Sequence, residues 1–381
     1  MHSANMKKTA FLALALFLLA GVAFASVPGQ RGWWLTLQRG QVMFDRGDYG
    51  NALLAFEDAR RERMAMFDRM ERDLIDALSL PEVRRLGDAL DWVDQALRDW
   101  RLSEAAAALD ELFFRVPRAS FGNSLAAALE AFWNLRYFPE AEIWIGRTFM
   151  ASGEFGLALA QFGSALERRD LFENPVLITE TLYDMAWIYR ARREFQEMER
   201  ALQSILEESA LWTGTGENWQ SGTFARDAMT RTLQLDGVER LLVLYRYDDA
   251  RGARAHRELG FFYLADGRHA RAQEHLMFAL VIQSTAIIDE LIRRRFDFTF
   301  TGLPSLAAEI ARDPTLSAYA LDSEYFRVIF YLANALHGNG HAARARELWT
   351  FLARHGGAGE WQARAATQLV SPQIGATSVM P

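Results

Sequence analysis

The sequence of 381 residues contains no cysteine. The chain therefore cannot form a disulfide, a thiolate metal site or a cysteine nucleophile. The same absence excludes the lipid-modified cysteine of a lipoprotein. Half of the residues are hydrophobic, so we expect burial of apolar side chains alone to hold the fold together.

Lysine is almost absent too, since Lys7 and Lys8 are the only two. Schiff-base chemistry and the lysine of a phosphate-binding loop are thus excluded from the rest of the chain. When residues 1–25 are set aside, 40 of the 42 basic residues remain against 49 acidic ones, a net charge of about −9. This acidic balance argues against nucleic-acid binding.

Motifs for catalysis and cofactor binding are also missing. The stretch Gly214-Thr215-Gly216 lacks the third glycine and the preceding strand of a dinucleotide fingerprint, and no Gly-x-Ser-x-Gly elbow occurs. His337 and His341 have a spacing that binds metals on a helix, but a predicted turn lies between them. His269 and His275 are interpreted as surface residues. We predict no catalytic residue, no metal site and no cofactor.

The N-terminus has the pattern of a secretory signal. Met6-Lys7-Lys8 is followed by the apolar stretch Ala10–Ala25, which ends in Ala23-Phe24-Ala25. The stretch is shorter than the roughly 20 residues that span a bilayer. We expect cleavage after Ala25 and a periplasmic or otherwise exported protein. No other segment is expected to be apolar enough to cross a membrane.

Proline is sparse, with nine residues that stand mostly at breaks in the pattern. Apolar residues recur at spacings of three and four, which predicts an all-helical chain. One pattern returns at a fixed spacing: a small residue in a first helix, a Gly-containing turn, then a small and a large residue in a second helix. The copies are Gly40, Gly47, Ala52 and Phe56; Gly146, Gly153, Ala158 and Phe162; Ala186, Met198 and Leu202; Gly260, Gly267, Ala272 and Leu276; Ala333, Gly340, Ala345 and Trp349; and, in part, Ala96, Ala105 and Leu109.

This recurrence has a mechanical meaning. The small residue of the first helix lets the second helix approach closely, and the turn glycine takes a positive φ that closes the hairpin. A single hairpin cannot bury its own apolar face, so the hairpins must stack.

The spacing resembles the tetratricopeptide repeat family, by direct match over about half of the chain. The resemblance implies a right-handed superhelix of about seven to nine antiparallel hairpins, an α-solenoid. Two gaps of about two repeat lengths predict further hairpins, at 223–235 with 238–248 and at 285–296 with 304–313. The expected organisation is a signal peptide at 1–25, hairpins with a long second helix from 51 to 78 at 26–117, hairpins at 118–209, a Trp- and Gly-rich loop at 210–222, hairpins at 223–370 and a flexible tail at 371–381.

In this family the first helix of each hairpin lines a concave groove that binds other proteins. Carried over position by position, the resemblance implies a partner-binding groove rich in arginine and aromatic residues, the types enriched at binding hot spots. Its candidate residues are Arg147, Tyr183, Trp187, Arg190, Arg254, Arg257, Phe261 and Arg327, with Gln41, Phe44, Met150, Phe330 and Asn334 at further positions. Trp212 and Trp219 form a second candidate contact surface.

The favoured interpretation is a non-enzymatic scaffold or adaptor in the cell envelope, which binds other proteins and forms a homo- or hetero-oligomer. The segment from Phe261 to Pro304 also resembles tetratricopeptide proteins of the spirochaete flagellar collar. Two alternatives stay open. A periplasmic solute-binding component predicts a deep apolar pocket near Trp187 and Phe261, whereas an enzyme acting on envelope polymers requires a catalytic carboxylate in a cleft.

Overall fold

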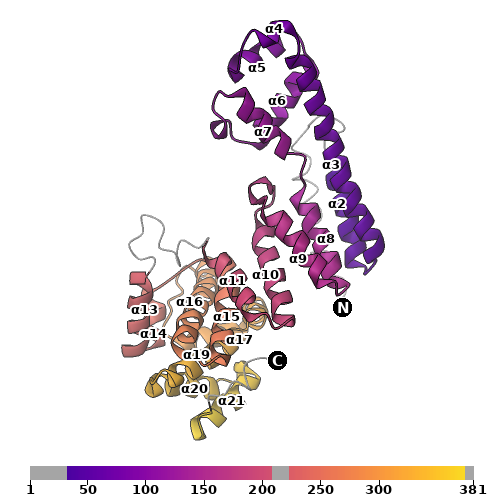
Figure 1. Cartoon of the computed structure of the whole chain (residues 1–381). Helices are drawn as coiled ribbons and strands as arrows, with labels where there is room; N and C mark the ends of the chain where they lie inside the picture. Colours follow the sequence, from indigo (N-terminus) through magenta and orange to yellow (C-terminus); the bar gives the residue numbers. More distant parts are fainter. Residues whose placement is uncertain (1–31, 208–222, 374–381) are drawn as a thin grey trace, which may run out of the picture. The chain divides into compact units, whose positions relative to one another are not determined.

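The computed structural model describes residues 32–207 and 223–373, and the regular structure of this part is helical (Figure 1). Within these two ranges the only β-type pairing is an isolated bridge between Ala89 and Ser124. The all-helical prediction is confirmed for this part of the chain. The predicted signal peptide, the contact tryptophans Trp212 and Trp219, and the tail beyond residue 373 lie outside the described residues.

The chain divides into two compact units between Ile178 and Thr179. We call their described residues the N-terminal unit (32–178) and the C-terminal unit (179–207 and 223–373). The division falls inside the segment 118–209, which the recurring spacing predicts as one group of hairpins. Two clusters of buried hydrophobic side chains lie in the N-terminal unit, and one large cluster lies in the C-terminal unit.

Helical hairpins build the N-terminal unit. Helix α2 (Gly32–Asp45) packs against α3 (Tyr49–Leu78), and α8 (Pro139–Ala151) packs against α9 (Phe155–Leu166). Helix α3 confirms the prediction of a long second helix, and it contacts both α8 and α6. The remaining elements are α4 (Pro81–Arg84), α5 (Leu90–Asp99), α6 (Ser103–Arg115), α7 (Leu125–Asn134) and the short 3₁₀ turns Arg118–Ser120 and Arg169–Leu171.

The C-terminal unit is a succession of packed helices. Contacts run from α11 to α15, from α15 to α16, from α16 to α19, and then through α20 to α21. Its helices are α10 (Val176–Ala191, which begins just before the division), α11 (Phe195–Glu207), α13 (Thr223–Leu235), α14 (Val238–Leu244), α15 (Ala250–Ala265), α16 (His269–Arg294), α17 (Leu303–Arg312), α18 (Pro314–Asp322), α19 (Tyr325–Gly338), α20 (Ala342–Arg354) and α21 (Glu360–Val370).

The same backbone turn closes each recurring hairpin. After the last residue of the first helix, one residue takes a positive φ, and the next N–H donates to the carbonyl oxygen five residues earlier, as in a Schellman motif. In four hairpins the positive-φ residue is the predicted glycine, and arginine takes its place in the other two. The bonds run from Asp48 to Met43, Leu102 to Leu97, Glu154 to Phe149, Glu194 to Tyr189, Arg268 to Tyr263 and His341 to Leu336.

The predicted close approach of paired helices is confirmed at Gly40, Gly146 and Gly260. A Cβ atom added at each of them would lie 2.5 Å from the side chain of Phe56, Phe162 or Leu276, respectively. These partners are the large residues of the second helix in the sequence pattern. Each glycine therefore makes room for a side chain that fills the interior of its hairpin.

Of the two hairpins predicted for the gaps between recognisable repeats, one is present and the other prediction is wrong. The pair at 223–235 and 238–248 exists as α13 and α14, although α14 ends at Leu244. The segment 285–296, in contrast, is the second half of α16. Neither glycine nor proline interrupts residues 269–301, so the helix continues to Arg294. Helix α17 packs with α18 instead.

The expectation that no segment after residue 25 is apolar enough to cross a membrane is wrong for α16. This helix is long and apolar enough to do so, yet 78% of its most apolar window is buried inside the unit. His275 on this helix is expected on the surface, but its side chain is buried, with 3% exposed. Its Nδ1 lies 3.0 Å from Nδ1 of the equally buried His256 on α15.

Candidate binding groove

Six of the eight predicted groove residues line one hollow of about 1090 Å³ in the C-terminal unit. We call it the arginine groove and define it by its five lining arginines, which come from α10, the turn after it, α15 and α19. The other lining residues belong mainly to these helices, to α16 and to α18. The six predicted residues that line it are Trp187, Arg190, Arg254, Arg257, Phe261 and Arg327; the additional arginine is Arg193.

The helical period explains why these side chains share one surface. On α15, Arg254, Arg257 and Phe261 are three and four residues apart, so they stand one above the other on the same face. Trp187 and Arg190 have the same relation on α10. Arg327 lies near the start of α19, where its guanidinium stands 4.5 Å from the ring centroid of Phe261.

Tyr183 supports the groove without lining it. Its ring lies 4.3 Å from the guanidinium carbon of Arg254, and its hydroxyl donates to the carbonyl oxygen of Arg251 at 2.6 Å. Burial raises the pKa of this hydroxyl, so it stays a neutral donor. The tyrosine thus holds the start of α15 against α10 and provides an aromatic face for Arg254.

Three predicted positions serve other purposes. Arg147 lies on α8 in the N-terminal unit, 4.9 Å from the ring centroid of Trp144, and is not among the lining residues of the arginine groove. Asn334 is 3% exposed and accepts a hydrogen bond from Trp349 Nε1 at 3.1 Å, so it joins α19 to α20 in the core. Phe44 packs against Tyr49 and Trp144 inside the N-terminal unit.

Positive charge exceeds negative charge along the groove. Five arginines line it against three acids, Glu258, Asp322 and Glu324, although the whole chain carries a net charge of −7. Arg254 Nε lies 2.7 Å from Glu258 Oε1, but 47% of the arginine side chain is still exposed. A guanidinium presents several N–H donors that match the two oxygens of a carboxylate. The groove can therefore bind an acidic group.

Glu324 organises the deeper arginines. Its carboxylate forms ion pairs with Arg257 (Nε to Oε2, 3.1 Å) and with Arg327. Arg257 NH1 also donates to the carbonyl oxygen of Asp322 at 3.4 Å. Glu324 has a φ of 55°, the left-handed region that residues other than glycine adopt rarely. Such backbone strain is concentrated at functional sites, which directs attention to the start of α19.

Gln283 is a groove residue that the sequence analysis missed. It lies on α16 and is 1% exposed; its Nε2 donates to the carbonyl oxygen of Ser323 at 2.7 Å. Among the described residues, neither its Oε1 nor the hydroxyl of Ser323 has a hydrogen-bond partner. A buried polar atom without a partner is costly, and a bound N–H group satisfies it. The resemblance to the tetratricopeptide family assigns groove positions only to the first helix of each hairpin, whereas Gln283 lies on a second helix. A glutamine within the apolar run of α16 is the feature of the sequence that could have indicated it.

The described residues hold no group of three or more His, Asp or Glu side chains placed to bind a metal ion. His337, whose spacing from His341 suits a metal site on a helix, has its ring 5.5 Å from that of Trp349. The chemistry of the groove is that of guanidinium donors, a buried amide and aromatic faces. These groups are able to bind and orient a ligand, and arginine does not exchange protons at physiological pH.

The geometry defines an all-helical protein of packed hairpins with an arginine-rich groove. No protein-family model matches the chain. A curated protein of Treponema pallidum (strain Nichols) is 27% identical over 344 residues, which cover 90% of this chain and 91% of that protein. Its name, "Uncharacterized protein", states no function. The similarity covers most of both units.

Proposed function

We propose that this chain is a non-enzymatic, exported scaffold of the tetratricopeptide type, whose arginine groove binds an acidic segment of a partner protein. The observation that supports the proposal is the convergence of six predicted residues on one hollow with excess positive charge. Recurring hairpins with glycine contacts and the same closing turn support the solenoid part of the proposal. The right-handed superhelix rests on the resemblance to the tetratricopeptide family alone.

The location and the process belong to the same proposal. The N-terminal pattern supports export to the periplasm. Burial of 78% of the most apolar window of α16 supports a place for this helix in the protein core and not in a membrane. The resemblance of the segment from Phe261 to Pro304 is the basis for proposing a role in assembling an envelope complex such as the flagellar collar. In this role the chain binds proteins, itself or others, and neither nucleic acid nor a cofactor.

The test compares the proteins captured from an envelope extract by the original full chain, by a groove variant and by a control variant. The double variant Arg254→Ala/Arg257→Ala removes two guanidinium groups from the groove, and we expect the captured amount of a specific partner to fall about ten-fold or more. The matched control is Arg200→Ala/Arg346→Ala, which removes two exposed arginines of the same unit outside the groove. Circular dichroism confirms that each variant is folded.

Equal capture by the groove variant and the control would rule out the arginine groove as the partner site. A solute-binding function is the second candidate, because the hollow includes both Trp187 and Phe261. Native mass spectrometry separates the two functions. A small molecule that remains bound to the full chain and is lost from the groove variant supports the solute function.

A further inference from the structure

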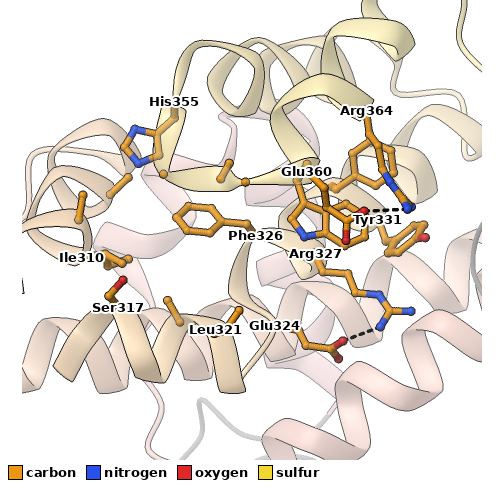
Figure 2. Close-up of a pocket in the computed structure, with 18 of the residues that line it drawn as sticks. Ile310, Ser317, Leu321, Glu324, Phe326, Arg327, Tyr331, His355, Glu360 and Arg364 are labelled. Atoms are coloured by element: carbon orange, nitrogen blue, oxygen red, sulfur yellow. Dashed lines mark hydrogen bonds and ion pairs between the residues drawn. The ribbon is translucent and has the colours of Figure 1, made fainter. Parts of the chain in front are cut away.

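A second hollow, of about 1250 Å³, lies next to the first in the C-terminal unit. We call it the aromatic pocket; α17, α18, α19 and α21 form its walls. Figure 2 shows Phe326 directed into its centre, Ile310, Ser317 and Leu321 on one side, and Glu360 and Arg364 on another. Its aromatic residues are Phe326, Phe330, Tyr331 and Trp361.

The aromatic pocket differs from the arginine groove in its charge. Its four ionised side chains form two ion pairs, Glu324 with Arg327 and Glu360 with Arg364, the latter at 2.8 Å (Figure 2). The remaining lining is mostly alanine, aliphatic and aromatic side chains. This chemistry favours an apolar side chain and provides no excess charge for an acid.

The two hollows share lining residues at the start of α19. Glu324 and Arg327 line both of them. The guanidinium of Arg327 lies against Phe261 in the arginine groove, at 4.5 Å, and 5.7 Å from the ring centroid of Tyr331, which lines the aromatic pocket. A chain segment bound in the arginine groove that crosses this ion pair would therefore reach the aromatic pocket.

We infer that the aromatic pocket binds an aromatic or aliphatic anchor side chain of the same partner segment whose acidic residues lie in the arginine groove. This inference rests on the proposed function and adds the chemistry of the partner: a protein segment that combines acidic residues with one large apolar residue. The excess of arginine in the groove selects the acids, and the neutral pocket selects the anchor.

The test uses a display library of random 16-residue peptides, selected on the immobilised full chain. We expect the enriched peptides to share acidic residues and a large apolar residue at a constant distance from them. The variant Leu321→Arg places a long charged side chain at the pocket, where the leucine is 81% exposed and contributes little to folding. Leu235→Arg is the matched control, since Leu235 is 69% exposed on α13 and lines neither hollow.

The inference requires that Leu321→Arg weakens the binding of a selected peptide about ten-fold or more, and that Leu235→Arg leaves it unchanged. Replacing the peptide's apolar residue by alanine must weaken binding to the original chain, but not to Leu321→Arg. Acidic peptides with no common apolar residue, or equal binding to Leu321→Arg, overturn the anchor and leave the proposed function standing. If no peptide is enriched, or acids are not selected, both fail.

Discussion

At the scale of single residues, the three hairpins with a glycine in the first helix depend on a position where one methyl group is too large. Gly146 on α8 faces the ring of Phe162 on α9, and an added Cβ would lie 2.5 Å from that ring and 3.3 Å from the carbonyl oxygen of Ala158. A backbone atom cannot move aside as a flexible side chain can. The glycine is therefore required by packing, although glycine inside a helix is otherwise destabilising.

We expect Gly146→Ala to lower the free energy of unfolding of the N-terminal unit by about 1–3 kcal/mol, because the pair of helices must separate to admit the methyl group. Gly163 on α9 of the same hairpin is the control, since nothing lies within 4 Å of a Cβ placed there. Gly163→Ala should raise the free energy of unfolding by up to about 1 kcal/mol. Urea unfolding measures both; a stabilising Gly146→Ala would contradict the close approach.

At the scale of elements, buried polar groups join helices that are distant in the sequence. Arg63 on α3 is 1% exposed, and its Nε donates to the carbonyl oxygen of Leu135 at 2.9 Å. Its NH1 lies 2.7 Å from Glu173 Oε1, and its guanidinium lies over the ring of Phe138 at 5.0 Å. Burial lowers the pKa of this arginine and the nearby acid Glu173 raises it. The network holds the long helix α3 to the segments around α8.

The histidine pair joins α15 to α16, and we expect it to make the C-terminal unit sensitive to acid. Burial, and then the nearby cations Arg271 and Arg226, lower the pKa of His275 to about 3. Burial and His275 lower the pKa of His256 as well. In the unfolded chain both rings bind a proton near pH 6.5, whereas in the folded chain they stay neutral well below it. Their contribution to stability is complete above pH 6.5 and is lost as the pH falls toward 3.

Between pH 6.5 and pH 5, we therefore expect the free energy of unfolding of the C-terminal unit to fall by about 1.6 kcal/mol for each histidine that stays neutral. The variant His256→Gln/His275→Gln keeps polar side chains and removes both titrating groups. Its stability should depend less on pH over this range. Urea unfolding at a series of pH values measures the slopes, and equal slopes for the variant and the original chain would show that the pair does not act in this way.

At the scale of the whole molecule, the described part of the chain has its buried side chains in separate clusters within two units. Repeat proteins bury their surface between neighbouring hairpins, so stability is a sum of local terms. Two units with separate cores need not unfold in one cooperative step. The arginine groove and the aromatic pocket both belong to the C-terminal unit, which alone therefore contains the proposed partner site.

We expect urea unfolding of the full chain to show two transitions. Gly146→Ala should lower the midpoint of one, and Gly260→Ala, whose added Cβ would lie 2.5 Å from Leu276, should lower the midpoint of the other. Fluorescence and circular dichroism followed together resolve the steps. A single transition that both variants shift equally would show that the two units unfold together.

The sequence by itself determined the local structure. Gly47, Gly153, Gly267 and Gly340 close hairpins because a positive φ suits glycine, and the helical period aligns Arg254 with Arg257. These are interactions between near neighbours in the chain, and residue types and spacings are enough to predict them.

Only the tertiary structure decided how helices meet across long separations. It showed that α16 continues through a predicted break, that His275 is buried against His256, and that Asn334 belongs to the core. It also placed Gln283 and Glu324 beside the predicted arginines of the groove. Which surface a helix buries depends on partners tens of residues away, and the spacing within one helix carries no information about those partners.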